Sequence, residues 1–234
     1  MKRLLKIGTL ESKIYSVFII LIFSTILIIQ VVTFRFTLET VRTSVHATNR
    51  TLLGQLVEQI DSYITGMDLI SKTVTEQQDV QLYLSSTQNR SEEAKAAIQD
   101  RLLTYLTVRD DVSDIMIVSA EDVFISSGPD AKLNPNAQIA EKEWYTRAVR
   151  AVDKAVISTA YVQNIIMGEY PWVVSLSRGI VSNKDRSLLG VLLIDLKFNR
   201  IKALCQSFTS TKKGYNFIID ENGNLRSELG HVEG

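Results

Sequence analysis

The chain has 234 residues, of which 45% are hydrophobic and 22% are charged, a composition typical of a folded protein with a sizeable core. Its 26 basic and 26 acidic residues cancel, but residues 1–13 carry a net charge of +3, so residues 14–234 sum to −3. The main body therefore has no broad basic face, which argues against nucleic-acid binding. The single cysteine, Cys205, excludes an intrachain disulfide and a cysteine-based metal site, and we expect it to be a buried apolar residue on a helix.

The first predicted element is a transmembrane helix over residues 14–34. Residues 14–32 contain no charge, and 19 helical residues would span about 28 Å, close to the thickness of the hydrocarbon core of a bilayer. By the positive-inside rule, the basic residues before it keep residues 1–13 in the cytoplasm and place the rest outside. The alternative is a cleaved signal peptide, but the apolar run is longer than usual and no Ala-x-Ala site follows.

A long extracytoplasmic helix is predicted next, over residues 35–84. Its apolar residues recur mostly at steps of three and four, which places them on one stripe of a helix. The stripe needs a partner, either the same helix of a second subunit in a homodimer or the flank of the following domain. Its members are Leu38, Val41, Val45, Leu52, Leu56, Ile60, Tyr63, Met67, Ile70 and Val74.

Residues 85–91 indicate a polar break, and residues 92–108 have helical spacing. Five β-branched, apolar segments follow and predict strands, with a short helix over residues 141–151 between the second and the third. Short connections favour an antiparallel sheet with helices packed on one side, an α+β, PAS-like fold. The predicted strands are residues 112–119, 123–127, 155–162, 171–178 and 188–196.

The last part, residues 198–234, predicts a linker helix over 198–208 and a hairpin over 214–227 that turns at residues 220–223. A lone hairpin is marginal in water, so we expect it to begin a second, smaller PAS-like module that is incomplete here. The predicted membrane-distal module is residues 85–197.

The pattern resembles the double Cache domain, the extracytoplasmic sensor of bacterial receptors. The residues that carry the resemblance are the anchor, the segment 54–84, the Glu143-Trp144-Tyr145 turn, the strand 190–196 and the segment 215–223. The long-helix segment most resembles sensor histidine kinases of the LytS/YesM type. Such receptors also carry a second transmembrane helix, a HAMP linker and a cytoplasmic effector, none of which is evident here, so we expect an N-terminal fragment or a truncated reading frame.

Asp195 is the main candidate for ligand binding, because a carboxylate inside an apolar strand must be hydrogen-bonded or paired. It shares a strand face with Val191 and Leu193 and would accept a ligand ammonium or hydroxyl group; the alternative is a structural cap or salt bridge. Amino-acid-binding Cache domains resemble this arrangement, with Trp144 and Tyr145 matching their Trp-Tyr pair. Those domains have an arginine where this chain has Lys142 and an upstream tyrosine where it has Ala137, which argues against an α-amino acid ligand.

Tyr161, Trp172 and Arg178, from the third and fourth predicted strands, are further candidates for the same cavity. For each aromatic candidate the alternative is a role in the core. His46 and His231 lack neighbouring ligands at metal spacing, so no metal and no cofactor are expected. No catalytic residue is proposed either, since no Ser/His/Asp constellation or phosphate loop is evident.

The sequence thus predicts a membrane-anchored sensor module without enzymatic activity of its own. Its partners would be a small extracellular ligand, or a binding protein loaded with one, together with the membrane and a second copy of the chain. The predicted parent is a two-component sensor histidine kinase; the alternatives are a chemoreceptor, a cyclic-dinucleotide cyclase, or a surface-tethered binding domain without signalling output.

Overall fold

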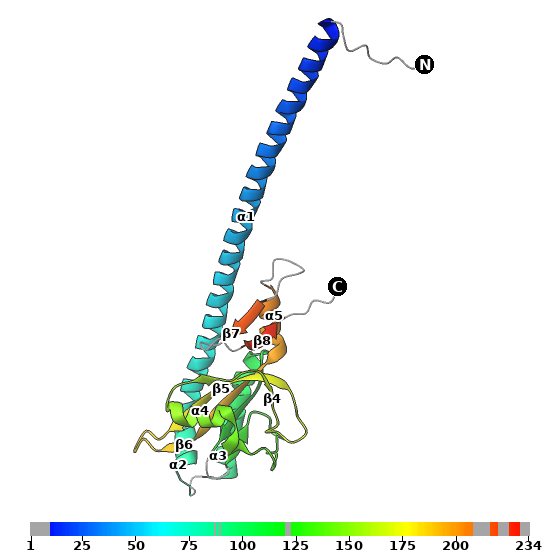
Figure 1. Cartoon of the computed structure of the whole chain (residues 1–234). Helices are drawn as coiled ribbons and strands as arrows, with labels where there is room; N and C mark the ends of the chain where they lie inside the picture. The colour runs from blue at the N-terminus through cyan, green and yellow to red at the C-terminus, as the bar shows by residue number, and fades with distance from the viewer. Residues whose placement is uncertain are drawn as a thin grey trace. The chain divides into compact units, whose positions relative to one another are not determined.

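The computed structural model describes residues 10–86, 88, 90–119, 123–207, 216–219 and 225–229, and side chains up to residue 203 except 11 and 12. The chain divides into two units, Met1–Gln55 and Leu56–Gly234. The first contains the greater part of one helix, and the second contains the sheet (Figure 1).

Helix α1 runs from Leu10 to Thr75 and includes the apolar run predicted to be a membrane anchor. Within the described residues it is the one helix that is long and apolar enough to cross a membrane, and the side chains of its apolar run are exposed. Residues 14–32 lack charges and residues 35–75 lack proline, so nothing in the sequence interrupts the helix between the two predicted segments.

The predicted apolar stripe of α1 divides into two parts. Leu56, Met67 and Val74 are buried within the second unit, so this half of the stripe packs on its own domain. Leu38, Val41 and Val45, in the first unit, are about half exposed. The homodimer contact predicted for the stripe stays a prediction.

The helix predicted over residues 35–84 is interrupted, which corrects the sequence-based expectation. Helix α1 ends at Thr75, and α2 (Gln78–Ser85) begins after Gln77, whose backbone is extended. Two features explain the break: β-branched residues at the end of α1 weaken it, and the Gln81 side chain donates a hydrogen bond of 2.8 Å to the Thr75 carbonyl oxygen.

Helix α3 (Glu92–Val108) matches the helix predicted after the polar break. The residue before it is Ser91, whose hydroxyl oxygen accepts a hydrogen bond of 3.1 Å from the Ala94 backbone N–H. This is an N-cap, which satisfies one of the free donors at the start of a helix.

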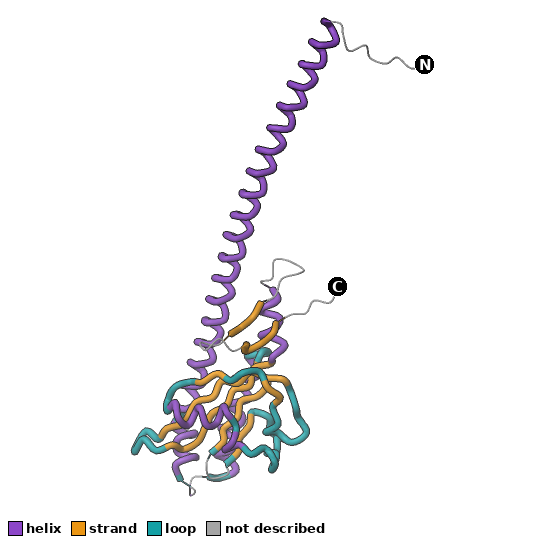
Figure 2. Tube along the Cα trace, in the orientation of Figure 1, coloured by secondary structure: helices purple, strands orange, loops and turns teal. Residues whose placement is uncertain are grey.

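The sheet has the order β2-β1-β6-β5-β3, with β4 also paired to β5, and every pairing is antiparallel, as predicted. Figure 2 shows the strands in orange. The strand predicted over residues 155–162 is two short strands that pair with different parts of β5. The strands are β1 (Val112–Val118), β2 (Phe124–Ser126), β3 (Val156–Ile157), β4 (Tyr161–Val162), β5 (Trp172–Val181) and β6 (Leu188–Lys197).

Helices cover both faces of the sheet, whereas the sequence predicted them on one side. Residues of α1, α2 and α3 pack with Ile115, Leu176 and Ile194 in one core cluster. Helix α4 (Glu143–Ala151), preceded by a 3-10 turn at Ile139–Glu141, covers the other face (Figure 1). It approaches β5 closely at Gly179, where an added Cβ would lie 3.2 Å from the Ala148 carbonyl oxygen.

Helix α5 (Phe198–Ser207) follows β6 directly, and β7 (Asn216–Ile219) pairs with β8 (Leu225–Leu229), as expected for the predicted hairpin. The predicted turn at residues 220–223 and the side chain of Cys205 lie outside the described residues. The assignment of residues 198–234 to a second module stays a prediction.

Candidate functional site

Asp195 lies in the middle of the sheet, on the face that α4 covers. It is opposite Ser175 of β5 on one side and Asp114 of β1 on the other. Only 1% of its surface is exposed. The predicted alternation of β6 is confirmed: Val191 and Leu193 share the Asp195 face with Trp144 of α4, whereas Ile194 belongs to the core on the opposite face.

Three neutral side chains form a network around the Asp195 carboxylate. The Gln163 amide donates a hydrogen bond of 2.7 Å to Oδ2, and the Ser175 hydroxyl donates one to Oδ1. Tyr161 adds a third member, because its hydroxyl lies 2.8 Å from the Ser175 Oγ. The structure therefore links Tyr161 to Asp195 through Ser175; that the two line a ligand cavity stays a prediction.

The network contains no positive charge. Among the described residues, no ion pair includes Asp195. Burial raises the pKa of Asp195 to about 7; the Ser175 and Gln163 donors oppose this increase and the nearby Asp114 adds to it. An uncompensated buried carboxylate of this kind is stabilised by a proton or by a cation.

Asp114 differs from Asp195 in its surroundings. The Ser126 hydroxyl donates a hydrogen bond of 2.7 Å to its Oδ2, and the Ser127 hydroxyl and the Ile115 backbone N–H donate to its Oδ1. Burial raises the pKa of Asp114 too. One donor belongs to β1, one to β2 and one to the residue that follows β2. Asp114 therefore ties the edge strand β2 to its neighbour β1.

Trp144 and Tyr145 lie on α4, and Lys142 is the residue that precedes this helix. Trp144 is buried and its ring meets that of Tyr145 edge-on, with centroids 5.7 Å apart. Among the described residues, the buried Trp144 Nε1 has no hydrogen-bond partner, and neither has the buried Asn164 Oδ1. Lys142 is half-buried.

Tyr145 also lines a cavity of about 470 Å³. The rest of its lining comes from the end of β1, from Val123 and from residues 133–141, and includes Ala137. Val118, at the β1 end of this cavity, pairs with Val191, four residues from Asp195 on β6. The cavity and the Asp195 network thus lie at different places along the same pair of strands.

A loop after β4 covers the Asp195 network. Ile165 and Ile166 are buried beside Trp144, and the Gln163 side chain accepts a hydrogen bond from the Ile165 backbone N–H. The loop is fastened to the segment around Asn134, whose backbone N–H donates a hydrogen bond of 2.7 Å to the Ile165 carbonyl oxygen. Asp195 is closed off from solvent in this structure.

Arg178 and Trp172 lie on the opposite face of the sheet from Asp195, so the structure does not bring them to the predicted cavity. Both are at even positions of β5, whereas Ser175 and Ser177 point toward Asp195 and α4. The buried Arg178 guanidinium contacts α1 through Asp68 and Ser71. Trp172 is 58% exposed and lies 6.2 Å from Phe198, measured between ring centroids.

Sequence reasoning missed Gln163 and Ser175, the two direct partners of Asp195. Gln163 stands two residues after Tyr161, and Ser175 and Ser177 are polar residues that alternate with apolar ones in β5. This alternation could have predicted Ser175 as a partner of Asp195, because it indicates that one face of the strand is polar. Among the described residues, no group of His, Cys, Asp and Glu side chains is placed to hold a metal ion.

Comparison with known proteins identifies the fold. The ligand-binding domain of the Campylobacter jejuni chemoreceptor Tlp3 with L-norvaline has a TM-score of 0.56 at 17% identity, over 76% of this chain and 66% of that one. The ligand-binding domain of the Pseudomonas fluorescens chemoreceptor CtaA with L-serine has a TM-score of 0.54 at 16% identity, over 76% of this chain and 68% of that one. The ligand-binding domain of the Pseudomonas aeruginosa amino acid chemoreceptor PctC with GABA has a TM-score of 0.54 at 19% identity, over 76% of this chain and 72% of that one.

The chain thus spans about two thirds of the length of these domains. No curated protein shows significant sequence similarity to it. Residues 37–233 match the Cache domain family dCache_1, which confirms the predicted sensor fold. A sensor domain rather than an enzyme was expected, and the family assignment agrees. By this match, which covers most of its length, the chain belongs to the Cache domain family.

Proposed function

We propose that this chain is the extracytoplasmic sensor of a membrane receptor and that it recognises a small molecule carrying an ammonium group at Asp195. The observation that carries the proposal is the buried Asp195 carboxylate, whose partners are all neutral. A ligand ammonium would supply the missing positive charge and would replace the Gln163 amide as donor.

Two further features support this assignment. L-norvaline, L-serine and GABA, the ligands of the solved neighbours, all carry an ammonium group. The Trp144 indole N–H and the Asn164 amide oxygen are buried near the network without a partner among the described residues, and such groups gain free energy when a ligand pairs with them. Lys142 offers a positive charge for a ligand carboxylate, the role that the family resemblance assigns to an arginine at this position.

The signal would leave the domain through α1. This helix carries the candidate membrane span, and its residues Asp68 and Ser71 bind Arg178 of β5, the strand that also holds Ser175. A ligand that moved β5 would therefore displace a residue attached to the helix. The membrane location, the outward orientation of the main body and the homodimer belong to this proposal.

For the output we propose a two-component sensor histidine kinase, on the resemblance of residues 54–84 to the LytS/YesM type. A chemoreceptor is the second candidate, and the names of the solved neighbours favour it. The coding sequence beyond Gly234 distinguishes them: a histidine phosphoacceptor helix and an ATP-binding domain would support the kinase, and a methyl-accepting coiled coil the chemoreceptor. A stop codon there would favour a tethered binding domain.

The ligand site is tested by screening the full chain, in lipid nanodiscs at pH 8, for thermal stabilisation by amines, amino acids, organic acids and sugars. We expect amines or amino acids to raise the Tm and Asp195→Asn to abolish this increase. Asp114→Asn is the matched control, because it removes another buried carboxylate from the neighbouring strand. Stabilisation that persists in Asp195→Asn, or that is lost equally in both variants, would refute the assignment.

A further inference from the structure

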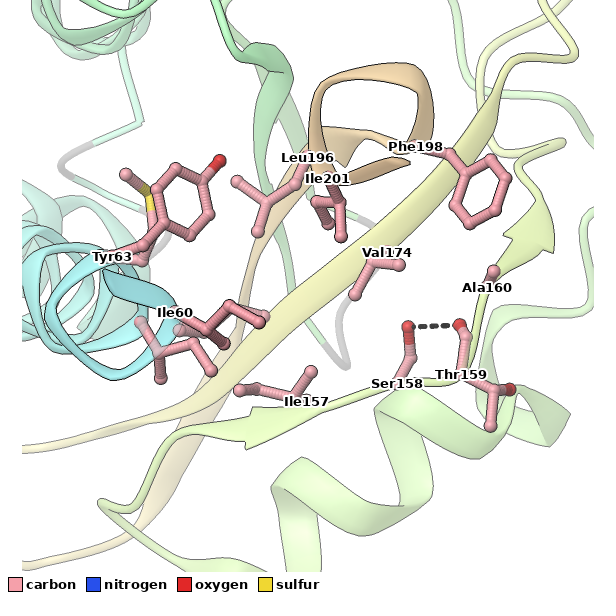
Figure 3. Close-up of a pocket in the computed structure, with 13 residues that line it drawn as sticks. Ile60, Tyr63, Ile157, Ser158, Thr159, Ala160, Val174, Leu196, Phe198 and Ile201 are labelled. Atoms are coloured by element: carbon pink, nitrogen blue, oxygen red, sulfur yellow. Dashed lines mark hydrogen bonds between the residues drawn. The ribbon is translucent and has the colours of Figure 1, made fainter. Parts of the chain in front are cut away.

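The sheet face opposite Asp195 contains an apolar cavity of about 130 Å³ that the proposed ligand site does not use. Figure 3 shows it between α1, the strands and the start of α5. Ile60 and Met67 line it from α1, Val174 and Leu176 from β5, and Ile201 from α5. All of these residues belong to the second unit of the chain.

The chemistry of the lining excludes charged and strongly polar occupants. Nearly all of the surface comes from aliphatic and aromatic side chains. The Ser158 hydroxyl, at the edge, is already engaged: it donates a hydrogen bond of 2.8 Å to the Thr159 carbonyl oxygen and accepts one of 2.9 Å from the Ser175 backbone N–H. A water molecule needs about two to four polar partners to be stable inside a protein, and this cavity offers few.

We propose that this cavity binds a small, uncharged, apolar molecule. An apolar cavity of about 150 Å³ engineered in another protein stays dry and takes up benzene or xenon. A cavity of about 130 Å³ with a similar lining therefore accommodates about six heavy atoms, such as an aromatic ring or a short branched hydrocarbon. Voids of this size are few in a close-packed domain, so the position of this cavity bears on what a bound molecule would do.

The position places an occupant against the two elements that the sensor would use. Ile60, Tyr63 and Met67 lie on one face of α1 at steps of three and four residues, and all three line the cavity. Val174 and Leu176 flank Ser175, which binds Asp195 from the other side of the same strand. The cavity is thus a second input site, separate from the proposed ammonium site but on the same strand.

The test is methyl NMR on the full chain in lipid nanodiscs, with ¹³C-labelled isoleucine methyl groups and benzene as the probe. Ile60, Ile64, Ile157 and Ile201 line the cavity and are expected to show saturable shifts. Ile165, on the Asp195 face, is not. The methyl signals of the isoleucines in residues 14–32 are expected to shift because of benzene dissolved in the lipid, so they are analysed apart from those of the cavity.

Ala160→Leu fills the cavity from its lining and is expected to weaken benzene binding at least tenfold. Ala97→Leu, on the exposed side of α3, is the matched control and is expected to bind as the wild type does. Val174→Phe provides a second filled variant if Ala160→Leu disturbs the apo spectrum. Absence of saturable shifts at the four lining isoleucines, equal shifts at Ile165, or undiminished binding in the filled variants would overturn the proposal.

Discussion

The contact between Arg178 and helix α1 is the most specific mechanical feature of the domain. Arg178 comes from the middle of the sheet and has a side chain that is only 5% exposed. Its Nε donates a hydrogen bond of 2.9 Å to the Ser71 Oγ, and its two terminal nitrogens donate to the Asp68 carboxylate and to the Asp153 carbonyl oxygen. We expect Asp68→Ala to destabilise the fold, because the buried guanidinium cannot be rehydrated.

The magnitude follows from the burial of the two partners. A hydrogen bond to a charged group contributes about 1.5–3 kcal/mol, and removing one partner of a fully buried ion pair costs about 3–5 kcal/mol. Asp68 is 46% exposed and the Asp153 carboxylate remains 3.7 Å from Arg178, so the lower range applies. We expect Asp68→Ala to cost about 2–3 kcal/mol, which lowers the Tm of a domain of this size by roughly 4–12 °C.

The assay is a double-mutant cycle of Asp68→Ala with Arg178→Met, read by heat unfolding of the full chain in nanodiscs. With Arg178 replaced, the half-exposed Asp68 is hydrated and its removal should cost little, so the double variant should be about as stable as Arg178→Met alone. Asp61→Ala, at an exposed position of the same helix, is the control and should stay within about 0.5 kcal/mol of wild type. If the two effects simply add, the contact does not stabilise the fold as argued.

Three further predictions concern the sheet and its core. Because the folded-state pKa of Asp195, about 7, exceeds its unfolded value, its stabilising contribution is greatest below pH 4 and is lost as the pH rises toward 7, by on the order of 4 kcal/mol. Asp195→Asn should flatten the dependence of Tm on pH between 5 and 8, and an unchanged slope would contradict this. Gly190→Ala should lower the Tm by several degrees, because the added Cβ would lie 2.7 Å from the Val118 carbonyl oxygen. Gly54→Ala is the control and should not lower the Tm, because no atom lies within 4 Å of its added Cβ. Equal Tm values for the two variants would exclude the clash. Met67→Ala removes a fully buried side chain and should cost about 2–5 kcal/mol; a Tm drop under 4 °C would show that the site collapses around the smaller residue.

Most of the fold could be predicted because each element has a strong local signal. Residues 92–108 have helical spacing and a capping serine, and residues 188–196 have the β-branched, apolar composition of a central strand. The break at Gln77 was missed because the local pattern continues through it. A long-range contact adds to the local causes of the break: the Gln81 amide, which donates to the Thr75 carbonyl oxygen, also donates a hydrogen bond of 3.0 Å to the Val181 carbonyl oxygen, 100 residues away.

The candidate site was predictable only in part. Asp195 stands out as a charge inside an apolar strand, and its environment requires partners whatever the fold. The identity of those partners depends on strand register, which places Ser175 opposite Asp195, and on the loop that brings Gln163 over it. Arg178 looked equivalent to Tyr161 in the sequence, but the parity of its position in β5 sends it to the opposite face.

The sequence by itself determined the long apolar N-terminal helix, the antiparallel α+β sensor fold and the need of the Asp195 carboxylate for hydrogen-bond partners, because hydrophobic periodicity and a charge inside an apolar strand are local properties. Only the tertiary structure decided which side chains meet on each face of the sheet. It placed a neutral hydrogen-bond network around Asp195 on one face, and both an ion pair to α1 and an apolar cavity on the other. Those pairings join residues from about 20 to 110 positions apart, a separation that no local pattern encodes.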